Sequence, residues 1–86
     1  MDFATVSRRA DRFAFEQIAD ILDNAIRSGE IPPRTMLPSE QEIMHQAGVS
    51  RATVRRAMQE LRERGVAYTR PNLGTFAAPD PPPRER

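Results

Sequence analysis

The side chains with the clearest chemistry are arginines in the middle of the chain. Arg51, Arg55 and Arg56 follow one another closely, and the hydroxyl groups of Ser50 and Thr53 accompany them. A guanidinium group carries its donors in a planar fork that matches phosphate oxygens and the edge of guanine, and hydroxyls can donate to phosphate. These residues therefore favour the binding of an anionic partner over catalysis.

The sequence lacks the groups that an enzyme or a metal site needs. It has no cysteine and a single histidine, His45, and no glycine-rich phosphate loop follows an expected strand. We therefore expect no enzymatic activity, no catalytic residue, no metal ligand and no cofactor. The absence of cysteine fits a reducing cytoplasm, and no apolar run approaches the roughly 20 residues that span a bilayer, so we expect a cytoplasmic chain without a membrane partner.

The arginines lie on an expected helix that begins after Ser50 and ends at Gly65. Its buried face is indicated by apolar residues at the spacing i, i+3, i+4 and i+7, namely Val54, Ala57, Met58 and Leu61. The opposite side carries Arg51, Ala52, Arg55, Arg56 and Gln59. A helix dipole favours carboxylates rather than arginines in its first turns, and a bound phosphate would remove this conflict.

A shorter helix is expected directly before this one. Ser39 can cap it while Glu42 reaches back to the Ser39 amide, and Gly48 can end it in the left-handed conformation. Its buried side is formed by Ile43, Met44 and Ala47. Residues 37–61 are therefore typical of a helix-turn-helix, whose second helix enters the DNA major groove with its N-terminal residues toward the bases.

A longer amphipathic helix precedes the helix-turn-helix and supplies much of the expected core. It runs from about residue 12, with Asp11 as a possible cap and Gly29 as its stop. Its apolar stripe consists of Phe15, Ile18, Ala19, Leu22, Ala25 and Ile26. The proline-rich residues 31–38 cannot continue this helix, and we expect Met36 and Leu37 to anchor them on the core.

Two short strands are expected after the last helix. Residues 66–69 and 75–78 are rich in residues that suit a half-buried pleat, and Asn72 and Gly74 between them tolerate the positive φ of a tight turn. Such a hairpin beside a recognition helix is called a wing. The pattern thus predicts a mainly α fold with a small β-hairpin, a winged helix-turn-helix of three helices and a two-stranded wing.

The domain boundaries and the charge distribution follow from the same patterns. We expect a flexible N-terminal arm over residues 1–11, the winged domain over residues 12–78, and a proline-rich disordered tail over residues 79–86. The net charge is only +1, but it is +4 over residues 50–70 and −3 over residues 1–49. This distribution indicates one basic face.

The order and spacing of these motifs resemble the N-terminal winged helix-turn-helix domain of the GntR family of bacterial transcription regulators. The resemblance covers about residues 15–77 and includes LPSE at 37–40, GVSRATVR at 48–55 and GTF at 74–76. It implies a sequence-specific regulator of transcription, most simply a repressor, that binds a palindromic operator in double-stranded DNA as a homodimer. A cytoplasmic, nucleoid-associated location would follow.

The resemblance and the solvent side of the third helix together name the candidate DNA-binding residues. They are Ser39, Gln41, Ser50, Arg51, Ala52, Thr53, Arg55, Arg56, Arg70, Asn72 and Gly74. Position 41 is glutamine where the family often has arginine, so a guanine contact that relatives make there is either lost or replaced by a preference for adenine. Asn72 stands where the wing usually has glycine, and Arg34 replaces the usual glycine after Pro33.

Several alternatives remain open on the sequence. The arginines could engage an acidic protein partner on a winged-helix scaffold that does not bind DNA. Gln41 is equally a solvated helix residue, and Arg8, Arg9 and Arg12 are better explained as solvated charges than as contacts to a DNA backbone. Family members normally continue into a C-terminal domain that binds an effector and dimerises, so we expect no effector site in these 86 residues; the tail fits a natural end and an interdomain linker equally well.

Overall fold

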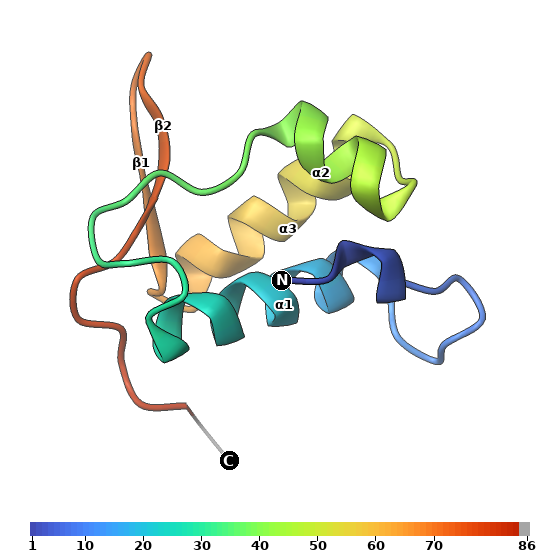
Figure 1. Ribbon diagram of the computed structural model, residues 1–86, viewed down its shortest axis with the longest axis horizontal. Coiled ribbons are helices and arrows are strands. Elements are labelled where there is room, and N and C mark those ends of the chain that lie inside the picture. The colour runs from blue at the N-terminus through green and yellow to red at the C-terminus, as the bar shows by residue number, and fades with distance from the viewer. Residues whose placement is uncertain (85–86) are drawn as a thin grey trace.

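Three helices and one β-hairpin follow one another in the predicted order (Figure 1). The computed structural model describes residues 1–84. Within them the α-helices are α1 (Ala14–Ser28), α2 (Glu40–Ala47) and α3 (Arg51–Glu63), and the antiparallel strands are β1 (Ala67–Arg70) and β2 (Gly74–Ala77). A short 3-10 helix, η1 (Phe3–Thr5), precedes them. The predicted winged helix-turn-helix is confirmed.

The junction between α2 and α3 forms through the predicted caps. Ser39 Oγ accepts a hydrogen bond from the Glu42 amide at 3.1 Å, and Ser50 Oγ accepts one from the Thr53 amide at 3.2 Å. Gly48 ends α2 with a φ of 68°. The predicted bond from the Ser39 amide to the Glu42 side chain is not formed. The Glu42 carboxylate instead accepts a hydrogen bond from Gln46 at 3.2 Å, one turn along the helix.

The start of α1 differs from the prediction. The N-cap is Phe13 rather than Asp11, which is exposed. Glu16 replaces a capping side chain, because its carboxylate accepts a hydrogen bond from the Phe13 amide at 3.2 Å. The predicted stop is correct, since Gly29 adopts the left-handed conformation at φ 88°.

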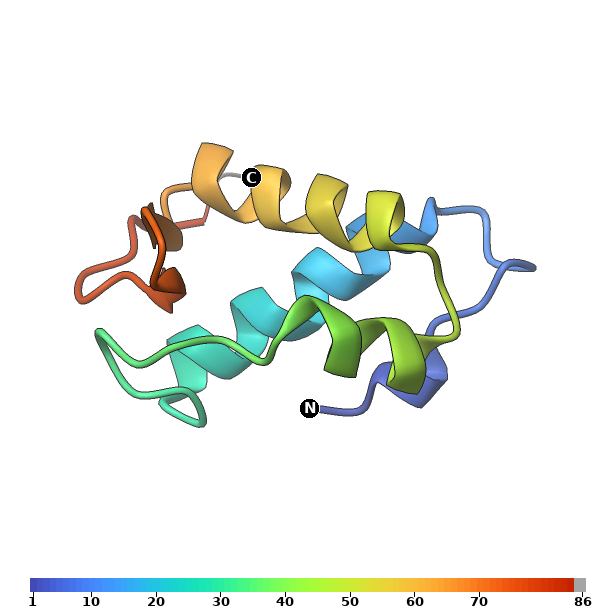
Figure 2. The same ribbon diagram turned by 90° about the horizontal axis from the view of Figure 1, so that it is seen from above.

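The hydrophobic core lies where the three helices meet (Figure 2). Its largest side chains that are completely buried are Ile18, Leu22, Ile43, Val54, Leu61 and Val66. Each contributes about 1.5 to 3 kcal/mol by leaving water, so the stripes read from the sequence account for the packing of α3 on α1 and of α2 on α3.

The segment before α2 attaches the wing to the helices. Leu37 donates its amide hydrogen to the Thr75 carbonyl at 2.8 Å, and the Ala77 amide donates to the Thr35 carbonyl at 2.9 Å. Leu37 is buried, whereas Met36 is 52% exposed. The expectation that Met36 anchors the segment is wrong, because neighbouring residues of an extended chain point to opposite faces.

The wing strands are each displaced by one residue from the prediction. Tyr68 lies opposite Phe76 and their rings stack at 5.8 Å, while Arg70 lies opposite Gly74 at the end of the ladder. The hairpin rises above the helices at one end of the molecule (Figure 1).

Both ends of the chain fold back on the helices. Phe3 is only 2% exposed and belongs to the core, so the prediction of an unstructured arm is wrong for η1. Residues 79–84 contain no helix or strand, but the Pro82 carbonyl accepts a hydrogen bond from Arg27 of α1 at 2.6 Å. The last two residues of the predicted disordered tail, 85 and 86, lie outside the described residues.

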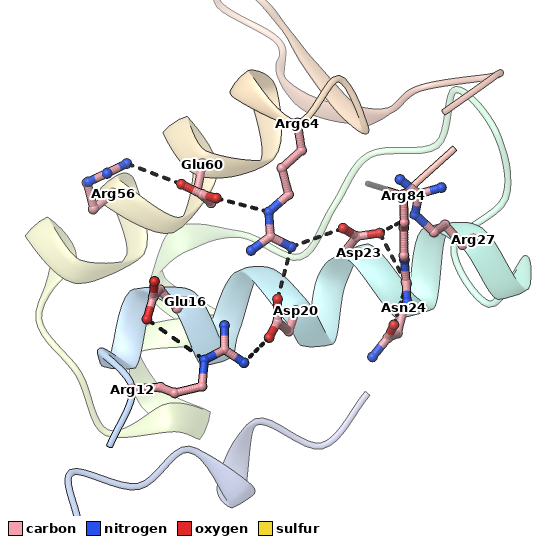
Figure 3. Close-up of polar contacts among 10 residues, drawn as sticks. All are labelled: Arg12, Glu16, Asp20, Asp23, Asn24, Arg27, Arg56, Glu60, Arg64 and Arg84. Atoms are coloured by element: carbon pink, nitrogen blue, oxygen red, sulfur yellow. Dashed lines mark hydrogen bonds and ion pairs between the residues drawn. The ribbon is translucent and has the colours of Figure 1, made fainter. Parts of the chain in front are cut away.

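A network of ion pairs joins α1 to the end of α3 (Figure 3). Arg64 reaches Asp20 at 2.9 Å and Asp23 at 3.0 Å, and also contacts Glu60 at 3.0 Å. Burial alone would lower the pKa of Arg64, but hydrogen bonds to these three carboxylates raise it above its ordinary value. The network holds the angle between α1 and the helix that carries the candidate site.

Candidate nucleic-acid interface

The start of α2, one side of α3 and the wing line a common groove. It brings together seven of the predicted site residues, Ser39, Gln41, Arg51, Arg55, Arg70, Asn72 and Gly74. Residues that are up to 35 positions apart in sequence therefore share one surface. The fold accounts for this, because the bonds of Thr35 and Leu37 to β2 place the wing beside the residues that lead into α2.

The other four predicted residues lie outside the groove lining. Ser50 and Thr53 are occupied at the start of α3, where their hydroxyl oxygens are 3.1 Å apart. Ala52 presents its methyl group to solvent. Arg56 turns toward α1, because its guanidinium stacks over the Phe15 ring at 4.4 Å and lies 3.8 Å from Glu60.

Glu40 is a residue of this surface that the sequence did not single out as a contact. Its carboxylate lies 2.9 Å from Arg51 Nη1 and 3.2 Å from Arg55 Nε, so one glutamate holds both arginines. The three side chains carry a net charge of +1. Exposed ion pairs of this kind add about 0.2 to 1 kcal/mol to stability, so their main effect is to fix where the guanidinium groups lie.

The wing tip presents polar and apolar groups on a tight turn. The Leu73 amide donates to the Arg70 carbonyl at 3.0 Å, and Asn72 adopts a φ of 65° as its residue type allows. Leu73 is 61% exposed. The turn therefore carries Asn72 and Leu73 away from the core, which is the arrangement expected for a hairpin that meets a partner.

Arg62 is a second residue of the groove that was missed. It lies on the same side of α3 as Arg51 and Arg55, because residues seven and eleven positions apart nearly coincide around a helix. Its Nη1 donates to Thr69 Oγ1 of β1 at 3.1 Å. The helical spacing was a signal that could have identified it.

The arginines near the N-terminus lie away from this groove. The loop before α1 and the wing are at opposite ends of the molecule in both views (Figures 1 and 2). Arg12 pairs with Asp20 and, at 3.8 Å, with Glu16. Its hydrogen bond with Asp20 raises the pKa of Arg12, so this side chain has an internal partner.

The described residues offer neither a metal site nor a membrane span. Within residues 1–84 no three histidine, cysteine, aspartate or glutamate side chains are grouped as metal ligands. No helix in this part of the chain is long and apolar enough to cross a bilayer.

Comparison with known proteins identifies the family of the fold. The model of the bacterial regulatory proteins of the gntR family matches residues 14–77. The chain belongs to this gntR family. The matched residues include α1 to β2 complete, which is the winged-helix DNA-binding domain of the family.

Named gntR-family relatives and one solved complex illustrate the similarity. The chain is 35% identical over 75 residues to the transcriptional regulator Rv1152 of Mycobacterium tuberculosis, covering 87% of the chain and 62% of that protein. It is 41% identical over 64 residues to the transcriptional repressor NagR of Bacillus subtilis, covering 74% of the chain and 26% of the repressor. The DNA-binding domain of AraR, solved with operator ORR3, superposes with a TM-score of 0.71 at 38% identity, covering 74% of this chain and 77% of that one.

Proposed function

We propose that this gntR-family chain binds an operator in double-stranded DNA and represses transcription by occupying it. The observation that carries the proposal is the shared groove of the α2 start, the arginine side of α3 and the wing. An α-helix with its side chains is about 10–12 Å across and fits the major groove, which is about 12 Å wide. The similar AraR domain was solved in complex with an operator, which supports operator binding by this chain.

Individual side chains take different roles in this proposal. Arg51 and Arg55 at the start of α3 read base edges, and each bidentate contact to guanine contributes about 1 to 3 kcal/mol of discrimination. Gln41 is exposed at the start of α2 and can pair with adenine. Arg70 and Asn72 of the wing meet the backbone and the neighbouring minor groove.

The capping residues contribute differently from the reading residues. Ser39, Ser50 and Thr53 keep their caps and can add hydroxyl contacts to phosphate, while Ala52 and Gly74 allow the DNA to approach closely. Arg56 contacts a flanking phosphate, which requires its guanidinium to leave Glu60.

We further propose that two copies bind a palindromic operator as a homodimer on the nucleoid, in the cytoplasm. A two-fold operator would place half-sites about one helical turn apart. No effector site is proposed in the 86 residues. The chain spans 62% of the length of Rv1152 and 26% of the length of NagR. Because it matches only part of these relatives, we give repression as a proposal.

Selection of bound duplexes from a random pool tests this function. We expect a recovered two-fold consensus, and an affinity for it that falls steeply with salt, by about 0.9 in log K per log salt for each neutralised phosphate. Arg55→Ala should cut specific binding by about 1 kcal/mol or more, and Arg8→Ala, which removes an equal charge far from the groove, should not. Failure to recover a consensus, with salt-insensitive binding, would instead support the scaffold for an acidic protein partner.

A further inference from the structure

The positive charge of the groove is distributed unevenly along α3 and the wing. Four arginines contribute to it, and Arg51 and Arg55 share the carboxylate of Glu40. Arg62 and Arg70 form no ion pair within the described residues. The least neutralised part of the groove is therefore the crevice between the last turn of α3 and strand β1.

Hydroxyl groups hold Arg62 in this crevice without neutralising it. Arg62 Nη1 donates to Thr69 Oγ1 at 3.1 Å, and Thr69 Oγ1 lies 3.3 Å from Thr75 Oγ1 on the paired strand. A guanidinium has five N–H donors, and this bond uses one. The side chain is thus oriented by the wing while most of its donors and its full charge remain available to an anion.

The length of α3 relates this crevice to the grooves of DNA. Arg62 follows Arg55 by seven residues, which at 1.5 Å per residue is about 10 Å along the helix axis. The major groove is about 12 Å wide, so a helix whose first turns reach the bases has its last turn at the groove edge, where the phosphate backbone runs. The wing lies beyond that edge and contacts the last turn of α3, so this backbone strand has to run over the part of the groove lined by Arg62 and Arg70.

We propose that Arg62 and Arg70 form a clamp for the phosphodiester strand that separates the major groove from the adjacent minor groove. The proposal rests on the proposed operator binding and adds a phosphate site to it. The two guanidinium groups donate to non-bridging phosphate oxygens, Arg62 from α3 and Arg70 from β1. Such contacts fix the register of the helix on the duplex but do not read the sequence.

The clamp predicts a distinct effect of Arg62→Ala on salt dependence. Loss of one phosphate contact should reduce the slope of log K against log salt by about 0.9, so that the affinity lost between 50 and 200 mM salt becomes about 3.5-fold smaller than for the wild type. The reduction of the slope should be equal for the selected duplex and for a scrambled duplex, because a phosphate contact does not depend on the base sequence. Arg8→Ala is the matched control, and its slope should equal that of the wild type.

Arg62→Lys separates the clamp from a purely structural role. Lysine is a poorer match to the geometry of the Thr69 bond but keeps the positive charge. Because the salt slope depends on that charge, Arg62→Lys should keep the slope of the wild type. If Arg62→Lys lost the slope as Arg62→Ala does, with both variants folded by circular dichroism, Arg62 would act only by holding the wing and the clamp would be wrong.

Replacing single phosphates by neutral methylphosphonates locates the contact. One linkage at the boundary of the two grooves should weaken the wild type severalfold, and the same replacement should have a smaller effect on Arg62→Ala, in which only Arg70 of the clamp remains. An equal penalty in both proteins at every position would overturn the clamp alone. If the wild type bound no duplex in a salt-dependent way, the proposed function itself would fail.

Discussion

Asp23 on α1 allows the ion-pair network beneath the recognition helix to be tested. Its carboxylate is buried, with a side chain that is 6% exposed, and it lies 2.5 Å from Arg27 Nε and 3.0 Å from Arg64 Nη1. Arg84 also pairs with this carboxylate, at 3.4 Å, so Asp23→Asn keeps the shape and removes the charge that three guanidinium groups face. Hydrogen bonds to charged groups contribute about 1.5 to 3 kcal/mol, and Arg64 keeps Asp20 and Glu60 as partners, so we expect the free energy of unfolding to fall by about that amount.

The same group predicts how stability depends on pH. Burial alone would raise the pKa of Asp23, but hydrogen bonds from Arg27 and Arg64 outweigh it and hold the pKa below its ordinary value. The unfolded chain therefore takes up this proton at a higher pH than the folded chain does. The stabilisation is present above the ordinary aspartate pKa of about 4 and is lost as the pH falls toward the folded pKa.

Urea denaturation of the wild type and Asp23→Asn over a pH series measures both effects. The difference in unfolding free energy should be full at pH 7 and should shrink as the solution becomes more acidic. Asp20→Asn is the matched control, because Asp20 also pairs with Arg64 but its side chain is 34% exposed. This substitution should lower the unfolding free energy by less than about 1 kcal/mol. A difference for Asp23→Asn that is below about 0.5 kcal/mol, or that does not change with pH, would refute the reasoning.

Three further substitutions address the core and the groove. Leu61→Ala removes a completely buried side chain and should destabilise the domain by about 2 to 5 kcal/mol in urea denaturation; a change under about 0.5 kcal/mol would remove Leu61 from the core. Glu40→Gln releases Arg51 and Arg55, so binding to scrambled duplex measured by fluorescence anisotropy should tighten while unfolding free energy changes by about 1 kcal/mol or less; unchanged or weaker non-specific binding would count against the pairing. Gln41→Ala should lower preference for adenine at one operator position by about 1 to 3 kcal/mol, and an unaltered selected consensus would mark Gln41 as a solvated residue.

The parts of the fold that depend on local chemistry could be predicted from the sequence. The caps at Ser39 and Ser50 and the stops at Gly29 and Gly48 involve bonds and backbone angles within one turn, and all four are found. Phe3 was missed because the apolar residues of the first ten positions follow neither a helical nor a strand period. Its burial depends on a surface that exists only after the helices have packed.

Contacts between different elements could not be predicted from the sequence. Glu40 meets Arg51 and Arg55 across the helix-turn-helix, and Asp23 meets Arg64 over 41 positions of sequence. Helical periodicity places a residue on a side of its own helix but does not identify which neighbouring element occupies that side. The same limit explains Arg56, which is on the solvent side by periodicity and yet stacks on Phe15 of α1.

Three sets of bonds connect the elements around the groove. The α1 network fixes the end of α3 through Arg64, the Arg62 bond to Thr69 joins α3 to the wing, and the bonds of residues 35 and 37 join the wing to the chain that enters α2. Each element that lines the groove is therefore held by bonds to another element, rather than by its own stability alone. Because flexible segments lose entropy when a partner orders them, a groove assembled beforehand keeps more of its contact energy as affinity. Weakening any one of these connections should consequently reduce affinity even where no DNA-contacting side chain has changed.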